Sequence, residues 1–270
     1  MMQEILRAYE ERPRHTVRNI IVVSVILFLT IWSTDVINYP GLFENGLDIA
    51  KNIFKALFNP SWNLLFSLQV DGIPLLMFQT LGIAFLGTLL GAVLSFPFAF
   101  LTARNIVGKF NIIGSTIISI IRSFPFFLIA LMFVRVSGPG PMTGVLTIGV
   151  LSIGMISKMY IEVIEDIDPS ILQSLDALGA TRYQKIRYGI MPQLTASIIS
   201  VIIYRFEINV KNATVLGIVG AGGIGVTLLT AMNAGRWRDT AAALWGIIVV
   251  VLIVDYFSTK IRRRLVGGRQ

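Results

Sequence analysis

The chain has 270 residues, of which 54% are hydrophobic and only 14% are charged. Soluble domains usually carry about 25% charged residues, so this composition excludes an ordinary soluble enzyme. Cysteine is absent and His15 is the single histidine, which gives no basis for a disulfide, thiolate chemistry or a metal site. A net charge of +8 would suit nucleic acid, but basic cytoplasmic loops of a membrane protein explain it better. We therefore expect an all-α polytopic membrane protein with no nucleic-acid partner.

Hydropathy predicts six spanning helices, near residues 17–36, 75–103, 112–136, 142–161, 194–220 and 240–257. The first follows an arginine-rich tail without an evident cleavage site, so we interpret it as a retained signal anchor. Most lysines and arginines fall in the two tails and in alternate loops, which contain Arg104, Lys109, Lys158, Arg182, Lys185 and Arg187. The positive-inside rule then places both termini in the cytoplasm.

The first external segment contains an amphipathic pattern. Between Asp48 and Phe58, apolar residues recur at helical spacing, and Asn59-Pro60 ends the pattern. This predicts a helix that lies in the outer membrane interface or packs on other external loops. We expect residues 1–74 to form the tail, first helix and external segment, and residues 75–265 to form a core with a cytoplasmic loop at about 162–192.

That cytoplasmic loop predicts a short helical hairpin. Asp168-Pro169 is a typical helix start, and Gly179 suits a helix end after Leu178. Thr181 and Gln184 then form a capping box for a second helix. We expect Gly189 and Pro192 to end this second helix before the fifth span. By itself the pattern is equally typical of an ordinary loop.

Two nucleotide motifs are excluded. Gly220-Ala-Gly222-Gly223-Ile-Gly225 matches the dinucleotide fingerprint, but it follows a membrane span rather than a strand, so we interpret the glycines as sites of close packing or a helix break. A phosphate-binding Gly-x-x-x-x-Gly-Lys-Ser/Thr sequence is absent, so ATP-driven work would need another subunit.

Charges inside the predicted spans mark a candidate pathway. A central arginine or lysine costs about 2.5–3.5 kcal/mol to insert, so such residues usually face a cavity, a partner or a pathway. Glu207 and Lys211 are spaced to form an i,i+4 ion pair, which would leave Arg122 and Arg205 as cations near mid-membrane. This favours passage of a small anion, although both arginines could instead bind backbone carbonyls. The candidate residues are Arg122, Arg205, Glu207, Asn209, Lys211 and Asn212.

These features resemble the inner-membrane permease subunits of ATP-binding-cassette (ABC) importers. That family carries a Glu-Ala-Ala loop followed by Gly and, thirteen residues later, by Pro; here Gly179 and Pro192 have this spacing. The Glu-Ala-Ala triplet reads Gln173-Ser174-Leu175, so its carboxylate is missing, although Asp176 follows directly.

Within that family the chain looks most like the phosphonate-importer permeases. The likeness depends on Arg122-Ser-Phe-Pro125, on the acidic sequence Glu162 to Asp168, and most specifically on the sequence Tyr204 to Gly225. It covers roughly residues 75 to 265.

The resemblance implies a type I importer fold and alternating access in the bacterial inner membrane. It implies a second copy of this chain, an ABC ATPase dimer, an extracytoplasmic substrate-binding protein and a small phosphorus oxyanion as partners. No cofactor is expected in this chain, because ATP and Mg would bind the ATPase. The implied coupling residues are Gln173, Ser174, Leu175, Asp176, Ala177, Leu178, Gly179, Ala180, Thr181, Arg182 and Pro192, and the implied outer gate is Gly220, Gly222, Gly223 and Gly225.

Three alternatives remain. A proton-coupled secondary transporter would use intramembrane carboxylates, for which Glu207 and Asp255 are candidates, but no paired halves are evident. A membrane-embedded enzyme would need converging catalytic groups that the sequence does not offer. The same family could instead import phosphite, hypophosphite, phosphate or, more distantly, methionine.

Overall fold

The structure is a computed structural model that describes residues 16–36 and 46–267. It divides into two units, residues 1–52 and 53–270, which are treated separately. The described part of the first unit contains α2 (Thr16–Val36) and the start of α4 (Gly46–Phe58), whose sequence is amphipathic as predicted. The described residues contain helices and no strand.

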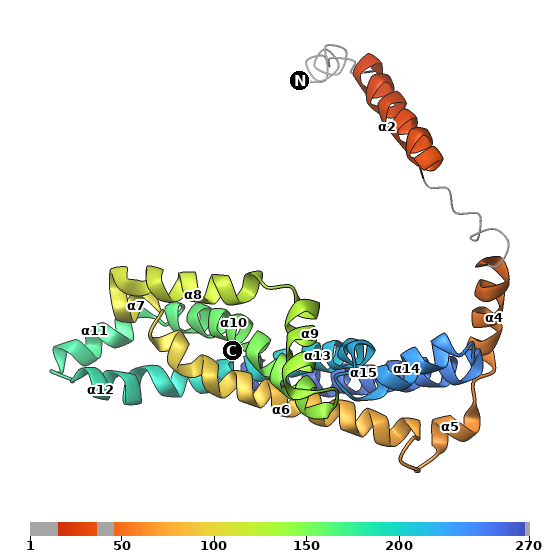
Figure 1. Ribbon diagram of the computed structural model, residues 1–270. Helices are drawn as coiled ribbons and strands as arrows, with labels where there is room; N and C mark the ends of the chain where they lie inside the picture. Colours follow the sequence, from red (N-terminus) through yellow and green to blue (C-terminus); the bar gives the residue numbers. More distant parts are fainter. Residues whose placement is uncertain (1–15, 37–45, 268–270) are drawn as a thin grey trace, which may run out of the picture. The chain divides into compact units, whose positions relative to one another are not determined.

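The second unit is a bundle built on four long helices (Figure 1). These are α6 (Ile73–Phe100), α10 (Pro141–Glu165), α13 (Met191–Leu216) and α15 (Trp237–Gly267). Short helices connect them: α5 (Trp62–Phe66), α7 (Arg104–Val107), η1 (Gly108–Phe110), α8 (Asn111–Ser123), α9 (Phe126–Ser137), α11 (Pro169–Ala177), α12 (Arg182–Gln184), η2 (Lys185–Ile190), η3 (Gly217–Val219) and α14 (Ile224–Asn233). The α11–α12 hairpin and α14 lie at opposite ends of the bundle (Figure 1).

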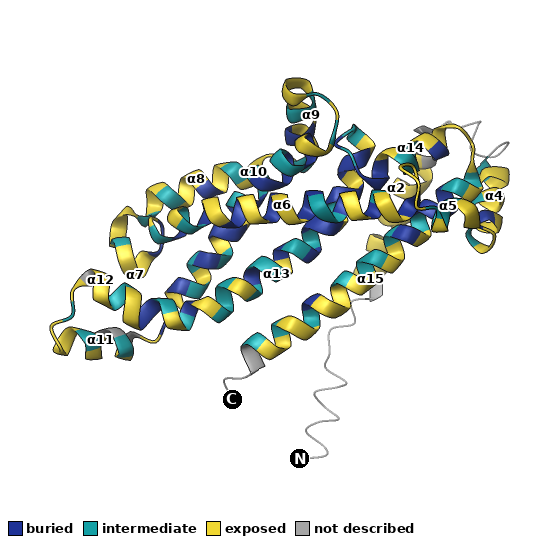
Figure 2. Cartoon of the chain, turned by 90° about the horizontal axis from the view of Figure 1, so that it is seen from below, coloured by how far each residue is buried: buried dark blue, intermediate teal, exposed yellow. Residues whose placement is uncertain are grey.

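Glycine allows α6 and α10 to pack closely. A Cβ added at Gly87 would lie 2.7 Å from Ile148, and one at Gly91 would lie 2.4 Å from the Ser152 Cβ. Such contacts between small residues are how membrane helices associate without a hydrophobic driving force. In Figure 2 the buried residues of α6, α10 and α13 face the inside of the bundle.

The outer faces of the bundle carry large exposed apolar side chains. On α6 these include Phe78, Phe85 and Val93, and on α15 they include Leu252 and Ile253. Four candidate spans are long and apolar enough to cross a membrane among the residues described: 73–123, 141–165, 185–219 and 237–265. Exposed apolar faces on such helices are suited to contact with lipid.

The structure differs from the predicted third span. The predicted span 112–136 is not one helix: it breaks at Phe124-Pro125 into α8 and α9, which meet at a corner in Figure 1. The residue before a proline is pushed out of the helical conformation, and Phe124 has an extended backbone with ψ 128°. The segment between the fifth and sixth predicted spans, for which no helix was predicted, contains α14.

The second hairpin helix also does not end at Gly189 and Pro192. The chain passes from α12 through a π-helical turn, Lys185–Ile190, directly into α13. Pro192 follows this π-helical turn, as the second residue of α13. The hairpin and the fifth span are therefore continuous helix. The expected division near residue 74 stays a prediction. By packing, α5 belongs with the core, because its Leu64 and Leu65 pack against a buried cluster that includes Ile73 of α6 and Ala242 of α15.

Candidate translocation and coupling sites

A buried polar cluster joins the three central helices. The Asn209 side-chain amide on α13 donates to the Thr88 hydroxyl of α6 at 2.9 Å and to the Ser152 hydroxyl of α10 at 2.9 Å. All three side chains are buried, and Asn209 is only 2% exposed. The sequence identified Asn209 but not its two partners, whose only signal was a hydroxyl inside an apolar span.

Arg205 lies one turn before Asn209 on the same side of α13. It is 7% exposed, and its Nε has no hydrogen-bond partner among the described residues. A guanidinium has five N–H donors and no acceptor, so it can be satisfied only by acceptor atoms or water. Asn212 lies seven residues after Arg205, also on this side of the helix, and is half-buried.

The predicted ion pair on α13 is confirmed, and it has a third member. Lys211 Nζ lies 3.2 Å from Glu207 Oε1, and Arg262 of α15 donates to Glu207 Oε2 at 3.1 Å. The Arg262 guanidinium also lies over the Tyr204 ring, 5.3 Å from its centroid. One carboxylate thus faces two cations, which leaves this cluster with a net positive charge.

Arg122 is not brought together with Arg205. It lies at the end of α8, is exposed, and packs its aliphatic stem on Gly154 of α10, where an added Cβ would lie 2.8 Å from the Arg122 Cγ. Gly154 is two residues after Ser152, and two positions differ by about 200° around a helix. The α10 helix therefore separates Arg122 from the Asn209 cluster.

The glycines that follow η3 form a tight turn into α14. Gly220, Gly222 and Gly223 have φ values of 88°, 82° and 74°, which favour glycine. A Cβ at Gly225 would lie 2.1 Å from the Thr214 carbonyl oxygen, so α14 can approach α13 this closely only without a side chain there.

This glycine turn is also tied to two other helices. The Gly140 N–H donates to the Gly220 carbonyl at 2.9 Å, and the Ile224 N–H donates to the Thr80 hydroxyl at 3.0 Å. Both a helix break and close packing, as interpreted from the sequence, occur in this segment. A strand that could support a dinucleotide is absent from residues 16–36 and 46–267, and those residues contain no cluster of three metal-ligating side chains.

The first helix of the hairpin begins and ends as predicted. The Asp168 carboxylate accepts a hydrogen bond from the Ser170 backbone N–H at 2.9 Å, which lowers the pKa of this carboxyl below its ordinary value. At the other end, the Gly179 N–H donates to the Asp176 carbonyl and the Ala180 N–H to the Leu175 carbonyl. With a φ of +71° at Gly179, these two bonds form a Schellman motif.

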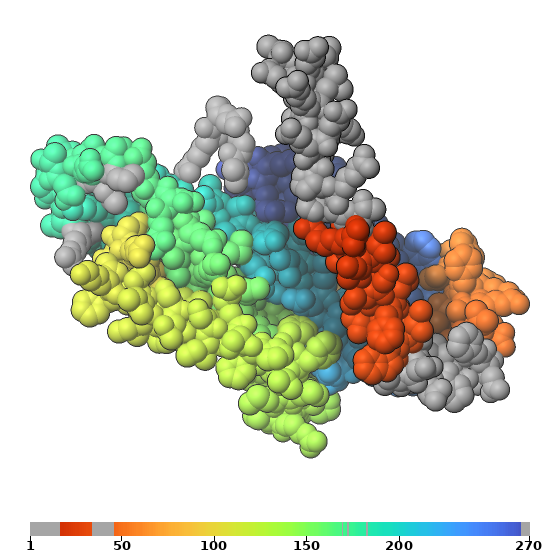
Figure 3. Space-filling view, turned by 90° about the horizontal axis from the view of Figure 1, so that it is seen from above, coloured from red at the N-terminus to blue at the C-terminus, as the bar shows by residue number. Residues whose placement is uncertain are grey.

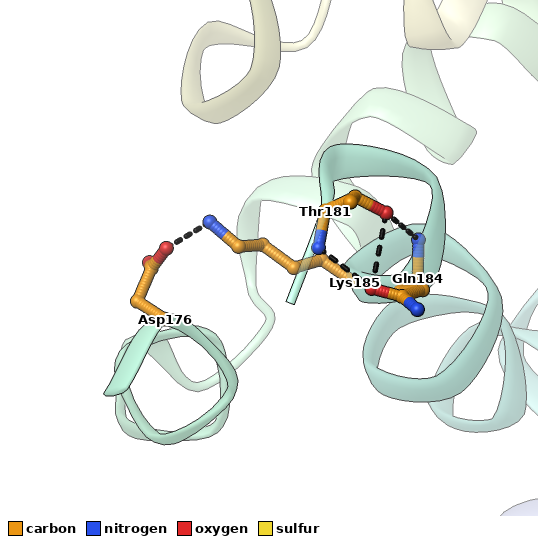
Figure 4. Close-up of polar contacts among 4 residues, drawn as sticks. All are labelled: Asp176, Thr181, Gln184 and Lys185. Carbon is orange, nitrogen blue, oxygen red and sulfur yellow. Dashed lines mark hydrogen bonds and ion pairs between the residues drawn. The ribbon is translucent and has the colours of Figure 1, made fainter. Parts of the chain in front are cut away.

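Polar contacts stabilise the second helix of the hairpin and join it to the first (Figure 4). The Thr181 N–H donates to the Gln184 side-chain oxygen at 2.8 Å, and the Gln184 N–H donates to the Thr181 hydroxyl at 3.4 Å, which is the predicted capping box. Lys185 forms an ion pair with Asp176, the residue that follows the sequence Gln173-Ser174-Leu175 found in place of Glu-Ala-Ala.

The hairpin also presents apolar side chains to its surroundings. Leu178 is 81% exposed, and Tyr183 and Tyr188 are each 67% exposed. The side chains of Gln173, Ser174, Ala177 and Thr181 are exposed as well. Exposed apolar side chains with polar neighbours are typical of a protein-binding surface, and the two tyrosines were not among the residues identified from the sequence.

Comparison with known proteins shows that most of the chain matches one protein family. Residues 95–267 match the family described as the inner membrane component of binding-protein-dependent transport systems. A provisionally named phosphite transport system permease protein of Stutzerimonas stutzeri is 32% identical over 264 residues, which cover 97% of this chain and 91% of that protein.

Two further relatives match over shorter stretches. A phosphate-import permease protein of Mycolicibacterium smegmatis is 34% identical over 72% of this chain and 37% of its own length. A provisionally named cryptic phosphonate transport system permease protein of Escherichia coli is 42% identical over 42% of this chain and 93% of its own length.

The fold is also found among solved structures. The inward-facing methionine ABC transporter superposes with a TM-score of 0.61 at 22% identity, over 70% of this chain and 94% of the matched chain. Among transporters, this arrangement of helices is the type I ABC importer permease fold.

Proposed function

Because this chain belongs to the family of binding-protein-dependent transport system inner membrane components, we propose that it moves a small phosphorus oxyanion into the cytoplasm, with phosphonate as the leading cargo. The chain is the permease of an ABC importer, and ATP hydrolysis in such importers belongs to a separate ATPase subunit. ATP and Mg therefore bind that partner, and this chain needs no cofactor of its own.

The observation that carries the cargo proposal is Arg205. Its guanidinium is buried one turn from a neutral polar cluster, with no carboxylate paired to it among the residues described. Arginine binds phosphate-like oxygens through paired charge-assisted hydrogen bonds, which are about twice as strong as neutral ones. Arg205, Asn209 and Asn212 thus offer donors and positive charge to a tetrahedral oxyanion, and Lys211 with Glu207 lies on the opposite side of α13.

The working unit contains more than one chain. Two copies would enclose the path, with both termini in the cytoplasm and the α11–α12 hairpins exposed to an ATPase dimer. An extracytoplasmic binding protein would deliver the anion at the opposite end, where Gly220, Gly222, Gly223 and Gly225 would form part of the outer gate. A path with different affinities in its inward and outward states allows directed transport.

The coupling route follows from the continuous helix. Since η2 leads directly into α13, a displacement of the hairpin reaches Arg205 and Asn209 along a helix with no intervening loop. The hairpin itself is stabilised by the Schellman motif at Gly179 and the ion pair between Asp176 and Lys185. The residues from Gln173 to Arg182, with Pro192 at the start of α13, form this coupling element.

Uptake into membrane vesicles tests this function. The vesicles would contain the chain with its ATPase and binding protein, and would receive labelled 2-aminoethylphosphonate, methylphosphonate, phosphite or phosphate, with and without internal ATP. We expect ATP-dependent accumulation of phosphonate. ATP-dependent accumulation of phosphite or phosphate alone would identify the alternative cargo that the relatives favour. Accumulation that ignores ATP and collapses with the proton gradient would overturn the importer.

A further inference from the structure

The α8 helix has two chemically different flanks. Helical spacing puts Ser115, Ser119 and Arg122 on one flank, whereas Ile113 and Ile117 lie about 200° away on the other. The buried edge between the flanks includes Ile118 and packs on α10. Figure 3 shows α8, in yellow-green, uncovered on this face of the chain. Ser115 and Ser119 on its polar flank therefore lack a hydrogen-bond partner within the described chain.

The polar flank lines a groove of about 830 Å³ that runs from α7 along α8. Arg104 and Lys109 lie at one end and Ser123 at the other, with Ser115 and Ser119 between them. The apolar side chains of Ile112 and Ile120 also line the groove. Both cations are exposed and form no side-chain ion pair with a described residue. The Glu165 carboxylate, which accepts a hydrogen bond from the Arg104 backbone N–H at 2.6 Å, offsets only one of these two charges. The groove is therefore positive at its mouth.

The serine hydroxyls are available to a ligand. Several threonine hydroxyls donate to a backbone carbonyl of their own helix, as Thr88 and Thr147 do, and Thr116 of α8 does the same. Ser115 and Ser119 form no hydrogen bond with any described residue. Hydroxyls and a terminal arginine are costly against lipid tails, so this flank needs water, a polar solute or protein beside it.

The two ends of the groove lie at different levels of the bundle. Asn105, next to Arg104, donates to the Ile164 carbonyl at the end of α10, just before the α11–α12 hairpin. The other end lies beside Arg122, which packs on Gly154 in the middle of α10. The groove therefore leads from the middle of the bundle to the end that carries the coupling hairpin.

We propose that the polar flank of α8 is the exit track of the permease, a water-filled, positively charged groove that conducts the released oxyanion from Arg122 past Ser119 and Ser115 to Lys109 and Arg104. This inference depends on the proposed importer function and adds to it a second set of residues, on the opposite side of α10 from Arg205. The apolar flank of α8, with Ile113 and Ile117, lines a separate groove beside Thr102 and faces away from the track.

Cysteine accessibility tests the track, because the native chain contains no cysteine. Single variants Ser115→Cys and Ser119→Cys would be compared with Ile113→Cys and Ile117→Cys, in the complete complex in inside-out vesicles. Each would be treated with an anionic and a cationic methanethiosulfonate of similar size, and the reaction followed by the mass of this chain. The serine positions should react, and the anionic reagent should be favoured about tenfold after correction for intrinsic reactivity. The isoleucine positions should not react with either.

The positive charge at the mouth of the groove provides a second test in the same experiment. Lys109→Gln should lower the anionic preference at Ser115→Cys several-fold, whereas Lys51→Gln, an exposed lysine on α4, should leave it unchanged. Millimolar phosphate or methylphosphonate should slow the reaction at Ser119→Cys. Unreactive serine positions, equal reaction at Ile117→Cys, or no charge preference would overturn the track.

Spontaneous disulfide linkage of Ser115→Cys to its counterpart in a second copy, with no charge preference, would identify a protein seam instead. Reaction without slowing by either anion would identify a helix that merely lies in the membrane interface. Both outcomes would overturn the track while ATP-driven uptake continued, whereas loss of ATP dependence in the uptake assay would overturn the importer itself.

Discussion

Burial distinguishes two arginines that the sequence grouped together. Arg205 is buried without a partner for its Nε, whereas Arg122 is exposed at the end of α8. The sequence could identify both as charges inside apolar runs, because insertion cost depends on residue type and position alone. It could not show that α10 separates them, since that depends on which face of α10 each neighbouring helix packs against.

Substitution of Arg205 should abolish uptake without preventing insertion. Hydrogen bonds to charged groups contribute about 1.5–3 kcal/mol, so Arg205→Ala should lower ATP-dependent uptake by roughly tenfold or more. Arg135→Ala removes an exposed arginine from α9 and should leave uptake within about twofold. The measurement is the uptake rate per amount of membrane-inserted chain, and normal uptake by Arg205→Ala would remove this residue from the path.

Asn209 should matter for stability in a way that Asn212 does not. Hydrogen bonds between membrane helices contribute about 0.6 kcal/mol each, and Asn209 donates two, so Asn209→Ala should lower the unfolding free energy by about 1 kcal/mol. Asn212→Ala, at a half-buried position on the same helix face, should change it far less. Thermal unfolding of both variants in detergent measures this, and equal effects would show that the α6–α10–α13 cluster does not hold the bundle together.

At the scale of elements, apolar runs and capping signals were sufficient for most helices. Asp168, Gly179 and the Thr181–Gln184 box are local signals, because each contact joins residues within a few positions, and each is confirmed. The break at Phe124-Pro125 was missed because hydrophobicity continues on both sides of it, although the proline itself was a signal. The Arg262 contact to Glu207 joins residues 55 positions apart, so no local pattern could show it.

The turn at Gly179 should couple ATP hydrolysis to transport. Left-handed backbone costs a non-glycine residue about 1–2 kcal/mol, so Gly179→Val should disturb the Schellman motif and the position of Leu178. We expect ATP hydrolysis by the complex to continue while uptake falls several-fold. Ala180→Val places the same side chain one residue later, where φ is not positive, and should preserve coupling. A wild-type ratio of transport to hydrolysis in Gly179→Val would show that the turn is not needed in this form.

At the scale of the whole molecule, three features lie at different positions along the bundle of the second unit. The exposed hairpin with Leu178, Tyr183 and Tyr188 offers a protein-binding surface at one end, and the glycine turn before α14 closes the other. Buried polar groups around Asn209 lie between them, joined to the hairpin by continuous helix. In the described residues, the exposed hairpin and the buried polar cluster thus lie on one continuous helical segment, and the sequence contains no phosphate-binding loop.

The isolated chain should therefore have no ATPase activity. Its sequence lacks a phosphate-binding loop, and the glycine-rich segment that resembles one kind of nucleotide motif is packed against Thr80 and Pro141, with an added Cβ at Gly222 only 2.8 Å from the Pro141 backbone nitrogen. Phosphate release by the purified chain with MgATP should equal the detergent background, and addition of the cognate ATPase should restore activity that removal of Mg abolishes. A hairpin variant, Leu178→Asp, should weaken this restoration by placing a charge in an apolar contact. Unfolding of this variant as the isolated chain should match that of the wild type, because Leu178 is exposed and the packing of the bundle does not depend on it. Nucleotide hydrolysis by the chain without its partner would mean that the energy source lies within this bundle, contrary to the division of tasks proposed for it.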